Sequence, residues 1–210
     1  DLTVTGVQTC ALPIFLKSIS GKDRFLDIEL KSMSRIDQVY LEETDVLILQ
    51  DPKYLSASAI ESMKRFLGEG GSILWFAGKN SENIDSITSS NLKLPKFIGR
   101  VQLEGESYFS VEVQDRDNPI LQELNLRDIN SALPQVFIYN SVEKQSYQKM
   151  ILSLNNGDPF LIEIPHSGSQ IYYFTSPLDL KWNDFGIKGL LIPLIHRLLI
   201  LSATDRKSVV

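Results

Sequence analysis

Residues 45–78, DVLILQDPKYLSASAIESMKRFLGEGGSILWFAG, carry the pattern of a strand, a helix and a second strand. The apolar run 46–49 ends at Asp51-Pro52, which is typical of a strand that is buried on both faces and closed by a turn. Apolar residues then recur at helical spacing between residues 60 and 67, and residues 73–77 form the next apolar run. Because parallel strands joined by a helix cross over with a right hand, this stretch predicts an open α/β sheet.

Both ends of the helix can be placed from their residues. Ser56 can cap the amino end directly, whereas a cap at Ser58 would put Glu61 at the carboxylate position of a capping box. Residues 68–71 read GEGG, lack the lysine and hydroxyl residue of a phosphate loop, and precede a strand, whereas phosphate loops precede helices. We therefore interpret these glycines as the carboxyl-terminal cap, since glycine adopts positive φ at low cost.

The remaining segments carry strand and turn signals. Residues 25–30 alternate polar and apolar side chains, as in a half-exposed strand. Residues 97–103 and 108–113 are β-rich runs around Glu104-Gly105-Glu106, which predicts a hairpin. The sequence further predicts a helical turn at 119–124, strands at 136–139, 150–154, 160–164 and 171–174, the last three as an antiparallel meander, and a closing helix at 189–202 with Pro193 in its first turn.

The two ends of the chain resemble foreign sequence. Residues 4–14, VTGVQTCALPI, resemble the in-frame translation of a short-read sequencing adapter, and residues 205–210, DRKSVV, resemble that of the adapter for the opposite end. We therefore expect residues 1–14 and 205–210 to be non-native, and residues 15–204 to be a fragment of one natural α/β domain. A natural amino-terminal strand is the alternative.

A fragment that begins near Phe15 would lack its first strand. Residues 15–19 resemble the last turn of a helix, and an open α/β domain normally places a strand, often a central one, before its first helix. We expect residues 2–7 to fill the open position in the sheet. We also expect the isolated chain to be only marginally stable.

The composition argues against several kinds of site. The net charge is -5 and the 21 lysine and arginine residues are spread along the chain, whereas a nucleic-acid surface needs a concentrated basic patch. The longest apolar stretch, 189–201, is too short to span a bilayer and carries His196 and Arg197. The histidines at 166 and 196 have no cysteine near them, so we expect no metal and no other cofactor. A single cysteine leaves the redox compartment open.

The segment 176–185, SPLDLKWNDF, has the richest polar cluster, with Asp179, Trp182, Asn183 and Asp184. It follows a predicted strand, and open α/β sheets bind ligands at the carboxyl ends of their strands. A ligand-binding loop is therefore one interpretation. The interpretation we favour is structural: Trp182 and Phe185 anchor the loop on the core, and Asn183 or Asp184 caps the last helix, because no base or nucleophile accompanies them.

Several motifs together resemble a known family. Residues 45–78 combine with GDP at 157–159, TSPLD at 175–179, WND at 182–184 and IPLIHR at 192–197. Their order and spacing resemble the class I glutamine amidotransferase-like domain of bacterial membrane proteins with an amino-terminal BatA (aerotolerance-type) region. The resemblance implies a flavodoxin-like sheet, a von Willebrand factor A-like region elsewhere in the parent protein, and membrane anchoring on the extracytoplasmic side of the bacterial envelope.

The same resemblance allows a test for catalysis. Class I amidotransferases carry a cysteine nucleophile between glycines after a central strand and a His-Pro-Glu after a later strand, because a thiolate needs an oriented imidazole. At the corresponding places this chain reads FAGKN at 76–80 and TSPL at 175–178. Ser176 stands where the histidine would be and Leu178 where the glutamate would be, while Ser81 lies nearby without an apparent base.

We therefore expect a non-catalytic interaction or scaffold domain with protein partners in a membrane-anchored envelope protein, and no nucleic-acid binding. A small-ligand module of the glycan-binding type, using the 176–185 loop, is the alternative. A hydrolase or amidotransferase is the least favoured of the three.

Overall fold

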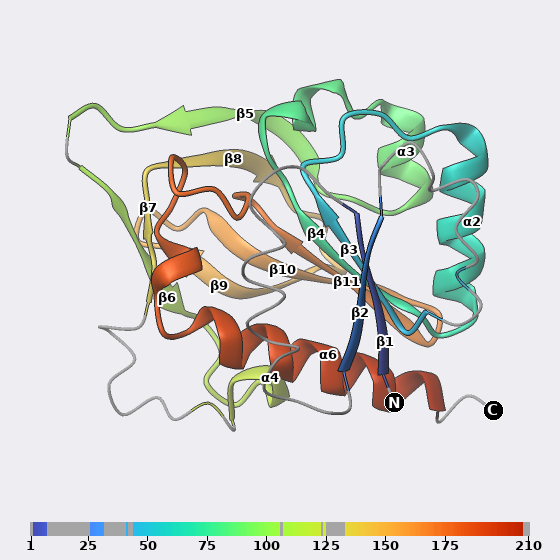
Figure 1. The fold of residues 1–210 in the computed structure, drawn as a ribbon. Helices are drawn as coiled ribbons and strands as arrows, with labels where there is room; N and C mark the ends of the chain where they lie inside the picture. Colours follow the sequence, from blue (N-terminus) through green and yellow to red (C-terminus); the bar gives the residue numbers. More distant parts are fainter. Residues whose placement is uncertain are drawn as a thin grey trace.

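The computed structural model describes residues 2–7, 26–31, 41, 44–105, 107–122, 124 and 133–207, and it has the predicted α/β class. Its centre is a nine-stranded sheet in the order β2-β1-β3-β4-β11-β10-β9-β6-β7, and a separate ribbon pairs β5 with β8 (Figure 1). The strands are β1 (Leu2–Val7), β2 (Leu26–Lys31), β3 (Val46–Gln50), β4 (Ser72–Phe76), β5 (Lys96–Gln102), β6 (Phe109–Val113), β7 (Gln135–Val136), β8 (Ile138–Glu143), β9 (Lys149–Leu154), β10 (Pro159–His166) and β11 (Ser169–Phe174). The helices are α2 (Ala57–Gly68), α3 (Ser86–Asn91), α4 (Pro119–Gln122) and α6 (Leu191–Lys207), with 3-10 turns η3 (Lys79–Asn83) and η5 (Phe185–Ile187).

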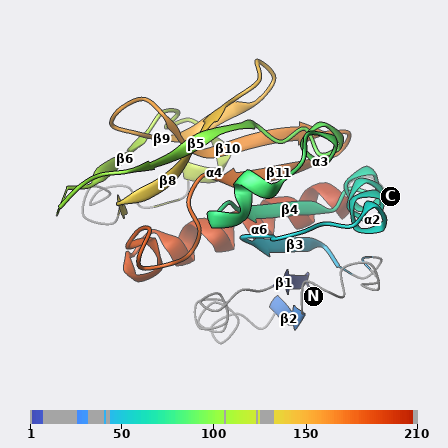
Figure 2. The ribbon, with the colours of Figure 1, turned by 90° about the horizontal axis from the view of Figure 1, so that it is seen from above.

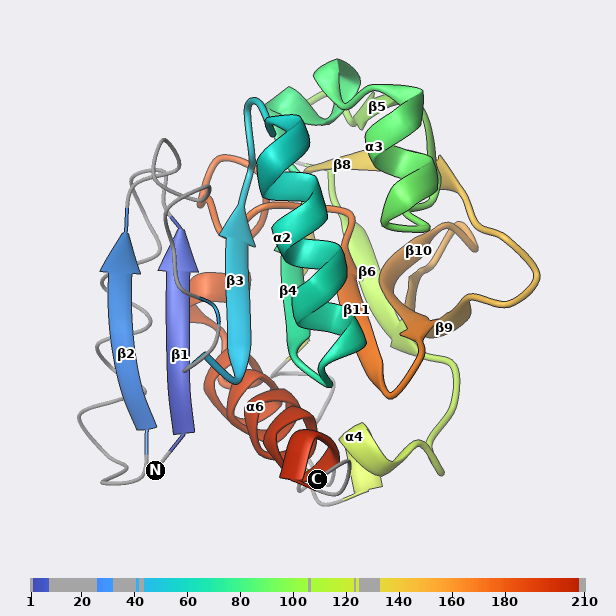
Figure 3. The same cartoon turned by 90° about the vertical axis from the view of Figure 1, so that its right-hand side faces the viewer.

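The predicted strand–helix–strand unit is confirmed as β3-α2-β4, and β3 and β4 pair in parallel. Successive residues of these strands point to opposite faces of the sheet. Leu49 and Trp75 belong to the core that contains α2, whereas Ile48 and Phe76 belong to the core that contains α6. Figure 3 shows α2 in front of these strands and α6 behind them. Burial on both faces explains why the strands are continuous apolar runs in the sequence.

The ends of α2 are set by Ser56 and by the glycines. The Ser56 Oγ accepts the N–H of residue 59 at 3.1 Å. The alternative capping box from Ser58 is wrong, because Glu61 instead pairs with Lys64 on the surface at 2.9 Å. At the other end Gly70 has a φ of +86°, and the N–H groups of residues 69–71 bond to carbonyls of residues 65–67. The glycine-rich segment is therefore a helix cap, as predicted.

β11 joins the parallel and antiparallel halves of the sheet. It pairs in parallel with β4 on one side and antiparallel with β10 on the other. β10 also pairs antiparallel with β9, so the predicted meander is confirmed. The connecting turns contain Gly157 with a φ of +89° and Gly168 with a φ of +80°, which are conformations that favour glycine.

The predicted hairpin at 97–113 is wrong. β5 pairs with β8 in the ribbon, whereas β6 pairs with β9 in the main sheet. The two strands separate because β5 alternates exposed and half-buried residues, while Phe109 and Val111 of β6 enter the main core. Gly105, with a φ of +70°, turns the chain between the two sheets. Figure 2, a view from above, shows the ribbon lying over the antiparallel half of the sheet.

Residues 2–7 occupy a position inside the sheet, as expected. They form β1, which lies between β2 and β3 and pairs in parallel with both. The foreign origin of residues 1–14 and 205–210 stays a prediction. Residues 15–19, expected to end a helix, lie outside the described residues.

α6 closes the chain and begins at Leu191, so Pro193 lies in its first turn as predicted. The helix continues to Lys207 and covers the sheet face opposite α2. Within the described ranges, no helix is both long and apolar enough to cross a membrane.

Candidate functional site at the carboxyl edge of the sheet

The carboxyl ends of β3, β4 and β11 meet at one edge of the sheet, and open α/β sheets place their ligands at this edge. Asp51 follows β3, residues 77–81 follow β4, and residues 175–177 follow β11. These segments include the places where the family resemblance locates the catalytic groups. The contacts of their polar side chains therefore decide what chemistry the edge can support.

Asp51 holds the segment after β4. One carboxylate oxygen accepts the backbone N–H of Asn80 at 2.8 Å, and the other accepts the Asn80 side-chain amide at 2.9 Å. Burial raises the pKa of the Asp51 carboxyl above its ordinary value, while the hydrogen bonds from Asn80 and the charges of Lys79 and Arg100 oppose that increase. Asp51 has a φ of +45°, in the left-handed region that aspartate tolerates better than most residues. The carboxylate is engaged in holding the loop.

Asn140 of β8 holds the same segment from another side. Its Nδ2 donates to the Gly78 carbonyl at 3.0 Å and to the Ser81 Oγ at 3.2 Å, and its backbone N–H donates to the Thr175 carbonyl at 2.8 Å. The side chain is fully buried, and its Oδ1 has no hydrogen-bond partner within the part of the chain that the structure describes. Asn140 thus links the ends of β4 and β11 to the β5–β8 ribbon.

Ser81 closely follows the segment 76–80, where the family resemblance would place a nucleophile. It is buried, and it hydrogen-bonds to the buried Tyr173 hydroxyl, whose pKa is raised by burial and lowered in part by this bond. His166 pairs with the first residue of β11, whereas Tyr173 lies near the end of that strand, about 13 Å further along. His196 lies on α6, across the sheet. The described residues hold no cluster of three potential metal ligands.

Asn183 is the structural centre of the loop 176–185. It is buried; its Nδ2 donates to the Ser176 Oγ and to the Pro177 carbonyl, both at 2.7 Å, and its Oδ1 accepts the Phe185 N–H at 3.0 Å. The Ser176 Oγ in turn donates to the Ile138 carbonyl at 2.9 Å. Phe185 is buried in the core, so its predicted anchoring role is confirmed. At the position assigned to the catalytic histidine, a serine therefore connects the loop to β8.

The predicted capping of the last helix by Asn183 or Asp184 is wrong. α6 begins several residues later, after η5. Asp184 instead accepts the Gln135 N–H at 2.7 Å through one oxygen, and its other oxygen lies 3.4 Å from the Lys188 Nζ. Both interactions attach the loop to neighbouring segments of the chain.

Trp182 and Asp179 are half-buried. The Trp182 carbonyl accepts the N–H groups of Phe137 and Ile138 at 2.8 and 3.0 Å. The chain is interrupted at this point, so the strand predicted at 136–139 is divided between β7 and β8. The Arg100 guanidinium lies over the Trp182 ring, 5.3 Å from its centroid. The Asp179 carboxylate accepts the N–H of residue 181 at 2.9 Å. Ligand binding at this loop stays a prediction.

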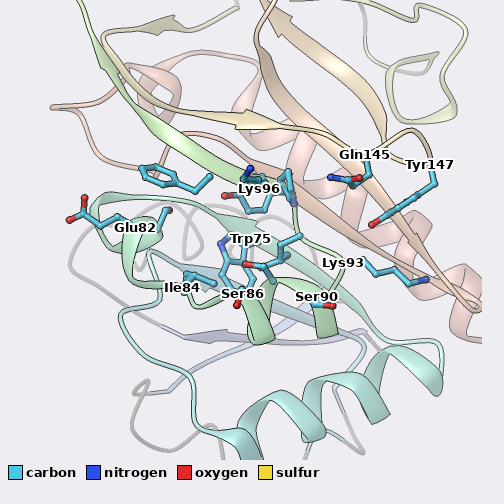
Figure 4. A pocket seen from close by; sticks show the side chains of 15 residues that line it. Trp75, Glu82, Ile84, Ser86, Ser90, Lys93, Lys96, Gln145 and Tyr147 are labelled. Carbon is cyan, nitrogen blue, oxygen red and sulfur yellow. The ribbon is translucent and has the colours of Figure 1, made fainter.

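A cavity of about 510 Å³ lies beside this edge, between α3, β5 and the loop before β9 (Figure 4). The sequence did not predict it, because its walls come from segments far apart in the chain. Trp75 and Tyr173 line it from the sheet as a stacked pair whose ring centroids lie 6.3 Å apart. The other polar and charged lining residues are Ser81, Glu82, Ser86, Ser89, Ser90, Lys93, Lys96, Gln145 and Tyr147.

The carboxyl end of α3 is fixed against the antiparallel half of the sheet. Lys93, which follows the C-cap residue Leu92, has a φ of +54°. The buried Gln148 donates from Nε2 to the Lys93 carbonyl at 2.7 Å, and the His166 Nε2 lies 3.2 Å from the Leu92 carbonyl. These two contacts hold the left-handed turn in place at the edge of the cavity.

We expect His166 to make the protein less stable in acid. Burial lowers its pKa below the ordinary value of 6.5; the bond to Leu92 opposes this shift and the charge of Lys93 adds to it. The unfolded chain therefore binds more protons below pH 6.5, so stability present above that pH is lost as the pH falls toward the folded-state pKa. Urea unfolding across this range should show a smaller loss for His166→Gln, whose amide can keep the bond to Leu92. An identical pH dependence in both proteins would contradict this role.

The fold is similar to several solved structures. Cytoplasmic protein STM1381 from Salmonella typhimurium LT2 matches with a TM-score of 0.73 and 12% identity over 95% of this chain and 99% of that one. Cytoplasmic protein STM3548 from Salmonella typhimurium matches with a TM-score of 0.69 and 14% identity over 96% and 98%. A ThuA-like protein from Bacteroides uniformis matches with a TM-score of 0.60 and 15% identity over 97% and 89%. No protein-family model and no curated protein matches the sequence. These likenesses show a shared α/β fold, compatible with the flavodoxin-like arrangement.

Proposed function

We propose that this chain is a non-catalytic interaction domain of a membrane-anchored bacterial envelope protein of the BatA and von Willebrand factor A type, with other proteins as its partners. The motif order from residue 45 to residue 197 supports this family and location. The α/β fold shared with the ThuA-like protein is compatible with the domain type.

The polar side chains at the carboxyl edge of the sheet are engaged in structural hydrogen bonds, and this observation is our reason to propose a non-catalytic domain. Asp51 binds Asn80, Asn140 binds Gly78 and Ser81, and Ser176 binds the backbone of β8. Covalent catalysis needs a nucleophile within hydrogen-bond reach of an oriented base. Here the same groups hold three strand ends and the ribbon together, which suits a rigid frame for protein contacts.

We expect no glutaminase or esterase turnover from this chain. Ammonia release from glutamine and hydrolysis of p-nitrophenyl acetate should stay at the rate of the protein-free blank, because the side-chain partners of Ser81 among the described residues, Asn140 and Tyr173, are neither an imidazole nor a thiol. Ser81→Ala is the matched control, since it removes the hydroxyl that directly follows the segment 76–80. Turnover above the blank that is lost in Ser81→Ala would overturn the proposal.

A glycan-type ligand at the 176–185 loop is the second candidate function. The half-buried Trp182 ring beside the Arg100 guanidinium favours this alternative, because small-molecule sites combine aromatic side chains with a few polar or charged groups. In a binding experiment, Trp182→Ala distinguishes a ligand bound at this loop from one bound in the cavity beside α3.

A further inference from the structure

The residues of α3 that line the cavity are small and polar. Ser86, Ser89 and Ser90 follow one another at helical spacing on α3 and line the cavity, and Lys93, beyond the end of the helix, lines it too. The opposite side of the segment carries the buried Thr88 and Leu92. Serine side chains are too short to fill a space of this size, and each hydroxyl both donates and accepts hydrogen bonds. This wall therefore suits a ligand that is itself rich in hydroxyl groups.

The remaining walls add aromatic surface and an amide. Trp75 and Tyr173, both buried, lie beneath the cavity on β4 and β11, and Tyr147 stands at its rim with 46% of its surface exposed. Gln145 lies beside Tyr147 in Figure 4. The volume of about 510 Å³ falls within the usual range of small-molecule sites. Aromatic rings among hydroxyl and amide groups match a molecule with apolar faces and polar edges, such as a sugar ring.

Two lysines make the cavity attractive to an anion. Lys93 lies on one side and Lys96 on the other. Lys93 makes no ion pair within the described part of the chain, and Lys96 lies 3.8 Å from Glu143, with both side chains largely exposed. Glu82, the acidic residue of the lining, lies 3.8 Å from Arg100. The described lining contains no glycine, which the backbone nests of many phosphate sites use, so we take a carboxylate as the anion that the lysines bind.

The backbone conformation of Lys93 is an independent reason to expect that this residue contributes to ligand binding. Its φ of +54° lies in the left-handed region, where glycine is favoured at the end of a helix. A lysine at such a position is strained, and strained residues persist where the surrounding structure fixes them. Gln148 and His166 provide that fixation. A lysine at this position, where glycine would be favoured, is explained if its ammonium group binds a ligand in the cavity.

We propose that the cavity between α3 and β5 binds a small anionic saccharide, a uronic-acid type molecule of about disaccharide size. Lys93 and Lys96 would bind the carboxylate, the α3 serines and Gln145 the hydroxyls, and Tyr147 one face of a sugar ring. This site is separate from the 176–185 loop, and it does not depend on the proposed protein-interaction role.

The test is calorimetric titration of the full chain with digalacturonate, with lactose as a neutral disaccharide of similar size. Digalacturonate should bind, and its Kd should rise by about tenfold or more in Lys93→Gly, because the charge-assisted contact is lost. The thermal midpoint of Lys93→Gly should be equal to or above that of the parent, since glycine adopts this φ freely. Lys93→Arg should retain binding, and so should Lys181→Gln, which removes an exposed lysine of the other loop.

Trp182→Ala decides which site is occupied. Binding that survives this substitution and is weakened by Lys93→Gly supports the cavity. Three results would overturn the proposal: no heat of binding with digalacturonate up to about 20 mM, an equal affinity for lactose, or an affinity that is unchanged in Lys93→Gly. Loss of binding in Trp182→Ala with no effect of Lys93→Gly would also overturn it, in favour of the loop.

Discussion

Gly78→Ala should lower the free energy of unfolding by about 3 kcal/mol, as expected for overpacking in a rigid interior. A Cβ at this position would lie 2.4 Å from the Asp51 Cγ and 2.6 Å from its Oδ1. Asp51 cannot move away without losing its bonds to Asn80. The φ of Gly78 is -130°, outside the left-handed region, so we attribute the effect to the contact with Asp51. Urea unfolding monitored by tryptophan fluorescence measures the change.

Two further variants make this measurement specific to Asp51. Gly99→Ala is the matched control, because no atom lies within 4 Å of the added methyl group, and it should change stability by less than about 0.5 kcal/mol. Asp51→Gly removes the clashing carboxylate and suits the φ of +45° at that position. Gly78→Ala combined with Asp51→Gly should therefore lose less stability than the sum of the two single changes. Full additivity would show that the clash with Asp51 is not the cause.

Asn140→Leu should lower the free energy of unfolding by about 2–3 kcal/mol, because a fully buried amide is replaced by a group that cannot donate. The Gly78 carbonyl and the Ser81 Oγ then lose their side-chain donor. The similar size of leucine limits any contribution from an empty space. Chemical unfolding at neutral pH measures the change, and Asn83→Leu on the exposed surface of η3 is the control.

A double substitution tests whether this loss comes from the hydrogen bonds. Once Asn140 is leucine, removal of the Ser81 hydroxyl should cost less than it does in the parent protein, because one of its partners is already absent. A loss of less than about 1 kcal/mol for Asn140→Leu would contradict the linking role of this amide.

The central unit of the fold was predictable from the sequence because each of its signals is local. Strands buried on both faces give continuous apolar runs, and the cap at Ser56 and the turn at Gly70 lie within a few residues of the helix they end. The hairpin prediction failed for a non-local reason. The turn signal at Gly105 is genuine, but the partners of β5 and β6 are decided by burial in two separate sheets. No local pattern contains that information.

The candidate site was predictable in part. The polar cluster at 179–184 does follow a strand end, and the predicted anchoring of the loop is confirmed for Phe185. Asn183 has a structural role other than the predicted one, because its amide is used entirely inside the loop. The capping role failed because η5 separates the loop from α6. The spacing of Ser86, Ser89 and Ser90 on α3, with Lys93 shortly after it, was available as a signal. The sequence could not show which segments face that helix, since the opposite wall of the cavity comes from β5 and from the loop before β9.

The position of β11 also bears on the order in which the protein folds. Leu161 and Phe174, paired across β10 and β11, are 13 residues apart, whereas Phe76 and Phe174, paired across β4 and β11, are 98 residues apart. Closing the longer loop costs roughly 2 kcal/mol more in chain entropy. We therefore expect the meander to assemble first from its short turns and to present β11 as a finished edge. β4 would then dock against that edge, so the parallel half would be the later and slower part to form.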